Sequence, residues 1–232
     1  MRMGIFFAEN LKDAVADHKA STMQEPIEFT NSLRGRYSFL SNFARCILDL
    51  PCHLEGRTVL IRSFSVEAEI QAVRYDPLPS DSDEIQELKA HLQHAIRSAP
   101  TATEASMLGR DDARGYDMVM SFRVRNALEP FRVAQIRPRP DWNQIQDACM
   151  IYLLRKKFEH AHFRIPLLAT EDALLIYRSR GDMYWGCTEE YGQNRLGQML
   201  MQVRSEIREE IRTTQAGAFL NSLEIPPSLI KA

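Results

Sequence analysis

An amphipathic stretch in the C-terminal part of this 232-residue chain places the strongest constraint on its fold. Apolar residues recur there at helical spacing: Leu196, Met199, Leu200, Val203, Ile207 and Ile211. Residues three and four positions apart share one face of an α-helix, so the pattern predicts a helix with a continuous apolar stripe. We expect this stripe to anchor the helix against the rest of the chain.

The segment before this helix, residues 182–186 (DMYWG), concentrates a carboxylate, two aromatic rings and a glycine. Asn194 directly precedes the helix, and asparagine is favoured at an N-cap because its side-chain oxygen can accept from a free backbone N–H. The N-terminus of a helix also suits phosphate and other anions. Asp182 and Trp185 therefore fit two interpretations equally: residues of an anion-binding pocket, or a capping carboxylate beside a packed ring.

The composition excludes several classes of protein. Hydrophobic residues make up 44% of the chain and charged residues 26%, as in ordinary globular proteins, and the length fits one domain. The formal net charge is −2, so no global basic field attracts a polyanion. Non-specific nucleic-acid binding is therefore not favoured, although a local basic pocket remains compatible with this charge.

The cysteines and histidines show no metal-ligand pattern. The four cysteines form no CxxC pair, and His91 and His94, three positions apart on an expected helix, are joined by no cysteine or carboxylate set. We expect no metal, no disulfide framework and a reducing, cytoplasmic compartment. Glu9 and Lys12 interrupt the N-terminal apolar patch, and no apolar run approaches the roughly 20 residues of a membrane span, so neither a signal peptide nor a membrane partner is expected.

Short β-prone runs alternate along the chain with longer stretches of helical spacing. Four β-prone runs predict strands over residues 27–29, 46–50, 58–62 and 173–177. Helical spacing predicts further helices over residues 66–75, 84–97, 104–108 and 142–160, and a short one that closes over 165–170. Ser65, Thr103 and Asp141 are the expected N-caps. In the 142–160 helix the expected inward residues are Ile145, Cys149, Tyr152 and Leu153.

These elements predict a helix-rich α+β fold in a single domain. Pro51 and Gly56 separate the second and third strands, which we interpret as an antiparallel pair. The isolated strands argue against a doubly wound parallel sheet and favour a small antiparallel β-sheet. Residues 1–24 are interpreted as an N-terminal extension and residues 213–232 as a weakly patterned tail.

The predicted 66–75 helix has two distinct faces. Val66, Ile70 and Val73 recur at core spacing. Glu67, Gln71 and Arg74 repeat that spacing one step around the helix, which aligns a carboxylate, an amide and a guanidinium. The pattern alone favours a solvated surface stripe for the second set.

Seven short motifs, taken in chain order, resemble those of one known family. They are residues 37–43 (YSFLSNF), 65–72 (SVEAEIQA), 104–110 (EASMLGR), Asp141-Trp142 with Lys157-Phe158, 167–170 (LLAT), 182–186 (DMYWG) and 194–197 (NRLG) with Leu200-Met201. Together they resemble the NADAR, or YbiA-like, family over roughly residues 27 to 210. The resemblance implies one domain over residues 25–212, with an insertion around residues 111–140.

Members of this family are N-glycosidases. One branch cleaves phosphoribosylamino-pyrimidine intermediates of riboflavin synthesis, and others are implicated in removing ADP-ribose. Breaking a C1′–N bond passes through an oxocarbenium-like sugar that a carboxylate stabilises, while an acid helps the base leave. The resemblance implies that Glu67 and Asp182 are the catalytic carboxylates, with no basis in the sequence for deciding which acts as the base.

The remaining site residues also follow from the resemblance. Gln71 and Asn194 would orient sugar hydroxyls, Trp185 would stack on the base, and Arg74, Arg110 or Lys157 would take phosphate. Asn42 and Gly186 complete the expected substrate-binding set. No metal or organic cofactor is implied, and the expected partner is a small ribosyl-phosphate compound or nucleotide.

Three positions depart from the family pattern. Ala68 stands where relatives often have histidine, Tyr177 where a carboxylate is usual, and Thr188 where a second glycine is usual. Three hypotheses therefore stand: an N-glycosidase acting on a ribosyl-phosphate compound, a catalytically inactive nucleotide or ADP-ribose-binding module, and an ADP-ribosyl hydrolase acting on modified nucleic acid. The near-neutral charge does not favour the third, and the sequence does not indicate the oligomeric state.

Overall fold

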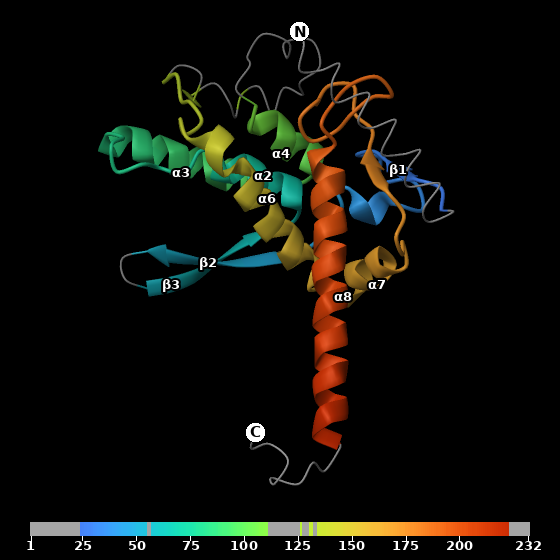
Figure 1. Cartoon of the computed structure of the whole chain (residues 1–232). Coiled ribbons are helices and arrows are strands. Elements are labelled where there is room, and N and C mark those ends of the chain that lie inside the picture. Colours follow the sequence, from blue (N-terminus) through green and yellow to red (C-terminus); the bar gives the residue numbers. More distant parts are fainter. Residues whose placement is uncertain (1–23, 55–56, 111–125, 127–129, 132–133, 223–232) are drawn as a thin grey trace.

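The computed structural model describes residues 24–54, 57–110, 126, 130–131 and 134–222 (Figure 1). Nearly all of the expected N-terminal extension, most of the expected insertion at 111–140 and the last ten residues lie outside the described part. The description below concerns the remainder of the chain.

Two small sheets, each of two strands, are present among the described residues. Strand β2 (Leu48–Leu54) and strand β3 (Arg57–Ser63) form an antiparallel hairpin, as the sequence predicts, and Figure 1 shows it extending away from the helices. β2 runs through Pro51, where the sequence predicted a break. A two-stranded sheet has a free edge on each strand, and a free edge tolerates the missing proline N–H.

The second sheet joins distant parts of the chain. Strand β1 (Ile27–Phe29) pairs in parallel with β4 (Leu175–Tyr177), with Phe29 opposite Tyr177. Both strands were predicted, but not their parallel pairing. The α+β, helix-rich fold class is confirmed, with one parallel pair beside the expected antiparallel one. Because parallel strands end at the same sheet edge, the loops that follow β1 and β4 start side by side.

Helices supply most of the described structure. They are the 3₁₀ helix η1 (Ser38–Leu40), α2 (Val66–Val73), α3 (Asp83–Arg97), α4 (Ala102–Leu108), α6 (Trp142–Phe158), α7 (Ala161–Leu168) and α8 (Arg195–Ser222). Ser65 caps α2 as predicted, since its side chain accepts from Ala68 N. The cap of α4 is Thr101 rather than Thr103, because Thr101 has the extended backbone of an N-cap and Thr103 already lies inside the helix.

Two predictions for α6 need correction. Asp141 occupies the N-cap position, but its carboxylate pairs with Arg139 at 2.6 Å and makes no capping hydrogen bond. Tyr152, predicted to point inward, is 41% exposed. The buried face carries Met150, Leu154 and Lys157 beside the correctly predicted Leu153.

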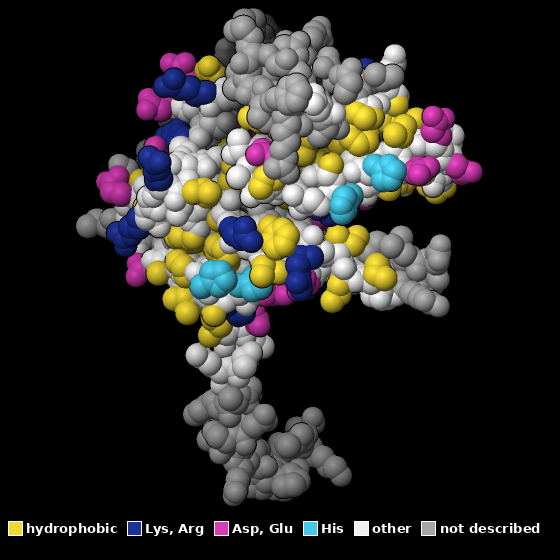
Figure 2. All heavy atoms as spheres, turned by 180° about the vertical axis from the view of Figure 1, so that it is seen from behind, with side chains coloured by type: hydrophobic (Ala, Val, Ile, Leu, Met, Phe, Trp, Pro, Cys, Tyr) yellow, Lys and Arg dark blue, Asp and Glu magenta, His cyan; other side chains and the backbone are white. Residues whose placement is uncertain are grey.

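Helix α8 confirms the apolar stripe of the sequence. Five of its residues are buried in the main core: Leu196, Met199, Leu200, Val203 and Ile207. The helix continues to Ser222, beyond the expected start of the tail at residue 213, and its C-terminal half projects from the body (Figure 1). Seen from behind, acidic and basic side chains are interspersed over the body, as the small net charge suggests (Figure 2).

Helix α2 lies between two hydrophobic clusters. Val66 and Ile70 belong to the main core around α6, α8 and the β1–β4 pair. Ala68 and Ala72, on the opposite face, belong to a second cluster formed with α3 and α4. Because both faces are covered, the Glu67 stripe is not the solvated surface that the pattern favoured: Glu67 is buried, Gln71 and Arg74 are half-buried, and all three line a pocket.

Candidate active site

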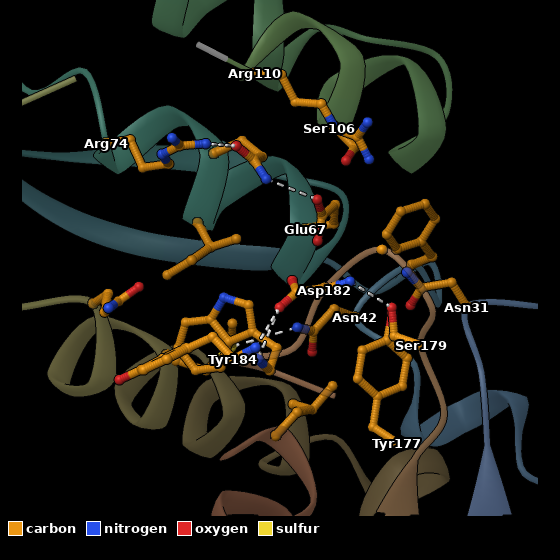
Figure 3. Close-up of a pocket in the computed structure, with 18 of the residues that line it drawn as sticks. Asn31, Asn42, Glu67, Arg74, Ser106, Arg110, Tyr177, Ser179, Asp182 and Tyr184 are labelled. Carbon is orange, nitrogen blue, oxygen red and sulfur yellow. Dashed lines mark hydrogen bonds between the residues drawn. The ribbon is translucent and has the colours of Figure 1, made fainter. Parts of the chain in front are cut away.

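A cavity of about 480 Å³ opens between α2, α6 and the loop that follows β4 (Figure 3). This size is in the range of small-molecule sites. Its described lining residues are Asn31, Asn42, Phe43, Glu67, Ile70, Gln71, Arg74, Ser106, Arg110, Trp142, Gln146, Met150, Tyr177, Ser179, Gly181, Asp182, Tyr184, Trp185 and Leu196. The pocket thus gathers segments that lie far apart in the sequence.

Seven of the residues predicted from the sequence line this pocket: Asn42, Glu67, Gln71, Arg74, Arg110, Asp182 and Trp185. Three others, Lys157, Gly186 and Asn194, do not belong to its described wall. Figure 3 shows the carboxylates of Glu67 and Asp182 approaching each other from opposite sides, one carried by α2 and the other by the loop after β4.

The Glu67 stripe forms a chain of hydrogen bonds. Gln71 Nε2 donates to Glu67 Oε1 at 2.9 Å, and Arg74 Nη1 donates to Gln71 Oε1 at 2.8 Å. Burial raises the pKa of the Glu67 carboxyl, and the nearby charge of Asp182 also raises it, while hydrogen bonds from Gln71 and Ser106 act in the opposite direction. A buried carboxyl whose pKa is raised is suited to holding and delivering a proton.

One oxygen of the Asp182 carboxylate accepts the backbone hydrogen bonds that hold the turn of the loop. Its Oδ1 accepts from the backbone N–H of Tyr184 at 3.1 Å and of Trp185 at 2.9 Å. Its own N–H donates to Ser179 Oγ at 3.1 Å. These bonds fix the carboxylate, so the capping interpretation and the pocket interpretation both apply: Oδ1 holds the turn, and the carboxylate as a whole faces the cavity.

The loop is fastened to both neighbouring helices through Asp147. The hydroxyl of Tyr184 donates to Asp147 Oδ1 at 2.7 Å, and Arg195, the first residue of α8, pairs with the same carboxylate. The carbonyls of Tyr184 and Trp185 also accept the first backbone N–H groups of α8, those of Arg195 and Leu196. Those two donors are therefore not available to an anion, contrary to the expectation from the sequence.

Asn194 has a different role from the one predicted. Its Oδ1 accepts from Tyr177 N and its Nδ2 donates to Leu175 O, both at 2.9 Å, so the amide binds the backbone of β4. The predicted side-chain cap on α8 is wrong. With both ends of its amide occupied and only 2% of the residue exposed, Asn194 is not placed to orient a sugar.

Lys157 and Gly186 lie behind the pocket wall. Lys157 is fully buried, and its Nζ donates to Ser41 O at 2.7 Å, a position that does not fit phosphate binding. A Cβ on Gly186 would lie 2.7 Å from Ser179 Cβ and 2.9 Å from Tyr177 Cδ1. The glycine is required by this close packing, which in turn holds Tyr177 in place.

Tyr177 is a pocket residue that the sequence marked only as a departure. Its ring packs against Phe29, with centroids 5.4 Å apart, and the residue is 6% exposed. Burial raises the pKa of its phenol, and the charges of Glu67 and Asp182 raise it further. The hydroxyl is therefore neutral in the pocket, where it forms a hydrogen bond with Ser179.

The other two departures lie away from the pocket wall. Ala68 is buried in the cluster between α2, α3 and α4. The hydroxyl of Thr188 accepts from the backbone of Glu190 and Tyr191 within its own loop. Of the three departures, Tyr177 alone therefore changes the chemistry of the described pocket.

Further lining residues came from segments to which the sequence gave no function. Trp142 was identified as the start of a helix and as part of a family motif but was given no role in binding, yet the guanidinium of Arg74 lies 5.9 Å from the centre of its ring. Asn31 and Ser179 reach the pocket because β1 and β4 pair in parallel. Only knowledge of that pairing could have pointed to them.

In the described part of the chain, no cluster of three or more histidine, cysteine or acidic side chains could hold a metal ion. None of the described helices has both the length and the apolar character needed to cross a bilayer. The polar side-chain groups among the described lining residues are carboxylates, amides, hydroxyls, indole N–H groups and two guanidinium groups.

Comparison with known proteins points to one family. A model of the NADAR domain matches residues 29–208. The N-glycosidase YbiA of Shigella flexneri is 37% identical over 93 residues, which are 38% of this chain and 58% of that protein. A riboflavin biosynthesis protein of Vibrio vulnificus is 33% identical over 121 residues, 50% of this chain and 32% of that protein. The matches span less than two thirds of these relatives.

A solved structure supports the same relationship. The NMR structure of the Escherichia coli protein YbiA aligns with a TM-score of 0.52 and 27% sequence identity. The alignment covers 80% of this chain and 86% of that one.

Proposed function

Because the chain belongs to the NADAR domain family, we propose that it is an N-glycosidase that hydrolyses the C1′–N bond of a ribosyl-phosphate compound. The observation that carries the proposal is the meeting of two carboxylates, Glu67 and Asp182, in one pocket lined by aromatic rings. Two carboxyl groups with different surroundings are the arrangement that most glycoside hydrolases use.

The surroundings of the two carboxyls favour a division of roles. Glu67, whose pKa is raised by burial, gives its proton to the departing nitrogen, which leaves with the electron pair of the C1′–N bond. Asp182, oriented by two backbone N–H groups, faces the positive charge that develops on the sugar and takes a proton from the water that adds to C1′. Asp182 then releases its proton to solvent, and solvent returns a proton to Glu67, so both carboxyls regain their starting states.

The rest of the pocket supports a phosphorylated ribosyl substrate. Trp185, with the neighbouring Tyr184 ring perpendicular to it, offers a flat wall for the base. Gln71 and Asn42 offer polar groups to the sugar, and Arg74 and Arg110 offer positive charge to phosphate. The proposed substrates are phosphoribosylamino-pyrimidines of riboflavin synthesis and ADP-ribosyl compounds.

The test is product release by purified protein. It is incubated with a phosphoribosylamino-pyrimidine or an ADP-ribosyl substrate, and ribose 5-phosphate or ADP-ribose is measured. We expect Glu67→Gln and Asp182→Asn each to lower kcat by about 100-fold or more, since general acid and base groups contribute factors of that order. Glu209→Gln, on the exposed part of α8, is the matched control and should keep full activity.

Substrates with different leaving groups distinguish the proposed acid role of Glu67 from the proposed base role of Asp182. A substrate whose base leaves easily needs no acid, so it should restore turnover to Glu67→Gln but not to Asp182→Asn. Equal recovery of both variants, or none in either, would contradict the assigned roles. Undiminished product formation in both variants would contradict the proposal as a whole.

One observation favours a second candidate function. Tyr177 stands in the pocket at the position where the resemblance places a carboxylate, so the protein could bind a nucleotide or ADP-ribose without cutting it. Titration calorimetry with ADP-ribose and ribose 5-phosphate distinguishes the two functions. Tight binding by the wild type with no product from any substrate would favour the binding module.

A further inference from the structure

Lys157 lies in the core at a position where burial of an amine is energetically unfavourable. It is fully buried on α6, with its Nζ 5.3 Å from the ring centre of Phe158 and 5.0 Å from that of Phe163. Burying an amine carries a large desolvation penalty, and an apolar side chain of similar length would fit such surroundings with a smaller penalty. The stability of the core therefore gives no reason for a lysine at this position.

Its hydrogen-bond partner gives such a reason. Nζ donates to the carbonyl of Ser41 at 2.7 Å. The hydroxyl of the same serine donates to Asn31 Oδ1 at 3.1 Å and accepts from Phe43 N at 3.0 Å. Ser41 is buried, and Asn31 and Phe43 both line the pocket. Lys157 thus holds the residue that arranges one wall of the site.

The same segment reaches Glu67. The carbonyl of Asn42 accepts from the backbone N–H of Glu67 at 3.0 Å. This N–H belongs to the first turn of α2, where backbone donors have no partner inside the helix. A displacement of residues 41–43 would therefore be passed to the helical turn that carries the Glu67 carboxyl.

We infer that Lys157 is a positioning residue of the pocket: by holding the Ser41 carbonyl it fixes residues 41–43 and, through the Asn42 carbonyl, the start of α2 at Glu67. It does this from behind the wall, without touching substrate. The consequence for turnover rests on the proposed N-glycosidase function. The consequence for the local order of residues 41–43 and the start of α2 does not depend on that function.

The test replaces Lys157 with methionine, which keeps the length and removes the donor. We expect the variant to fold with an unchanged or higher unfolding temperature, because a buried amine is replaced by an apolar side chain. Hydrogen exchange of the Phe43 and Glu67 amides should become about tenfold faster or more, while amides in the buried part of α8 keep their protection. Turnover should fall by about 100-fold, as expected when a reacting group is displaced by about 1 Å.

Lys156→Met is the matched control. Lys156 is the preceding residue, lies at the surface and pairs with Glu159, so its loss should change neither local exchange nor turnover. Should Lys157→Met not fold, Lys157→Gln serves as the second variant, and failure of both to fold would overturn the inference in favour of a simple core role.

Two other results would also overturn it: unchanged exchange at Phe43 and Glu67, or exchange that rises uniformly through the whole domain. If the wild type releases no product from any substrate, the proposed function fails but the exchange measurements still decide the role of Lys157.

Discussion

The side chain of Gln71, which donates to Glu67, packs directly against Gly109 at the end of α4. A Cβ on Gly109 would lie 2.5 Å from both Gln71 Cβ and Gln71 Oε1. The glycine therefore permits the hydrogen-bond chain of the Glu67 stripe. Nothing in the sequence pattern linked these two residues, because they belong to different helices.

We expect Gly109→Ala to lower turnover, because the new methyl group displaces Gln71 and breaks its bond to Glu67. Gln71→Ala should lower turnover by a similar factor, about tenfold, because the Glu67 carboxyl loses one hydrogen bond. The double variant should be no worse than Gly109→Ala alone, since both changes act through one bond. Independent, multiplying effects on kcat would contradict this coupling.

Tyr177 offers a test of pocket electrostatics. Tyr177→Glu would add a carboxylate beside Glu67, and a neighbouring like charge raises a carboxyl pKa. The alkaline limb of the kcat/KM profile, which reports loss of the Glu67 proton, should then move to higher pH. Tyr191→Glu, at an exposed position outside the described pocket wall, is the control and should leave the limb in place. Turnover that appears only in Tyr177→Glu would instead favour the binding module.

Lys157 makes a separate prediction about stability. Burial lowers its pKa from 10.5 to about 7, and the charge of nearby Cys46 acts in the opposite direction. Between these two values the unfolded lysine binds a proton that the folded one does not, so the free energy of unfolding should increase as pH rises from about 7 to about 10.5.

The prediction is measured by denaturant unfolding at several pH values. The wild type should gain stability relative to Lys157→Met across that window, and below about pH 7 the difference should be constant. A difference that does not change with pH would contradict it.

At the scale of elements, α2 shows what periodicity can and cannot predict. The spacing of Glu67, Gln71 and Arg74 correctly predicted one aligned stripe, because helical geometry alone fixes it. Its burial was not predicted. That depends on α3 and α4 covering the opposite face at Ala68 and Ala72, and small residues give only a weak periodic signal.

The loop that carries Asp182 depends on Asp147 of α6, which binds both Tyr184 and Arg195. Asp147→Ala removes the acceptor for both, so we expect faster hydrogen exchange in residues 183–186 and a KM raised by about tenfold, as local opening competes with binding. Asp49→Ala, which breaks a surface pair with Arg62 on the hairpin, is the control. Equal behaviour of the two variants would show that the loop is held by its backbone contacts alone.

For the whole molecule, the sequence predicted local elements well and their assembly poorly. The strand at Ile27 and the apolar run ending at Tyr177 were both identified, because alternation and apolar runs are local signals. Their parallel pairing was not, since no local pattern reports which distant strands meet. Asn31 and Ser179 were missed for that reason, and Asn194 was misjudged because its partner is the backbone of β4.

The pairing of β1 with β4 also determines the stage of synthesis and folding at which the site can form. Glu28 and Arg178, which pair beside this sheet, lie 150 residues apart, so closing the sheet encloses most of the domain in one loop. Contacts of such separation form late and slowly. During synthesis on the ribosome, β1 has no strand partner until β4 has been made. A nascent chain therefore carries Glu67 long before it has a pocket, and the described pocket wall is complete only once Leu196, in the first turn of α8, has been made.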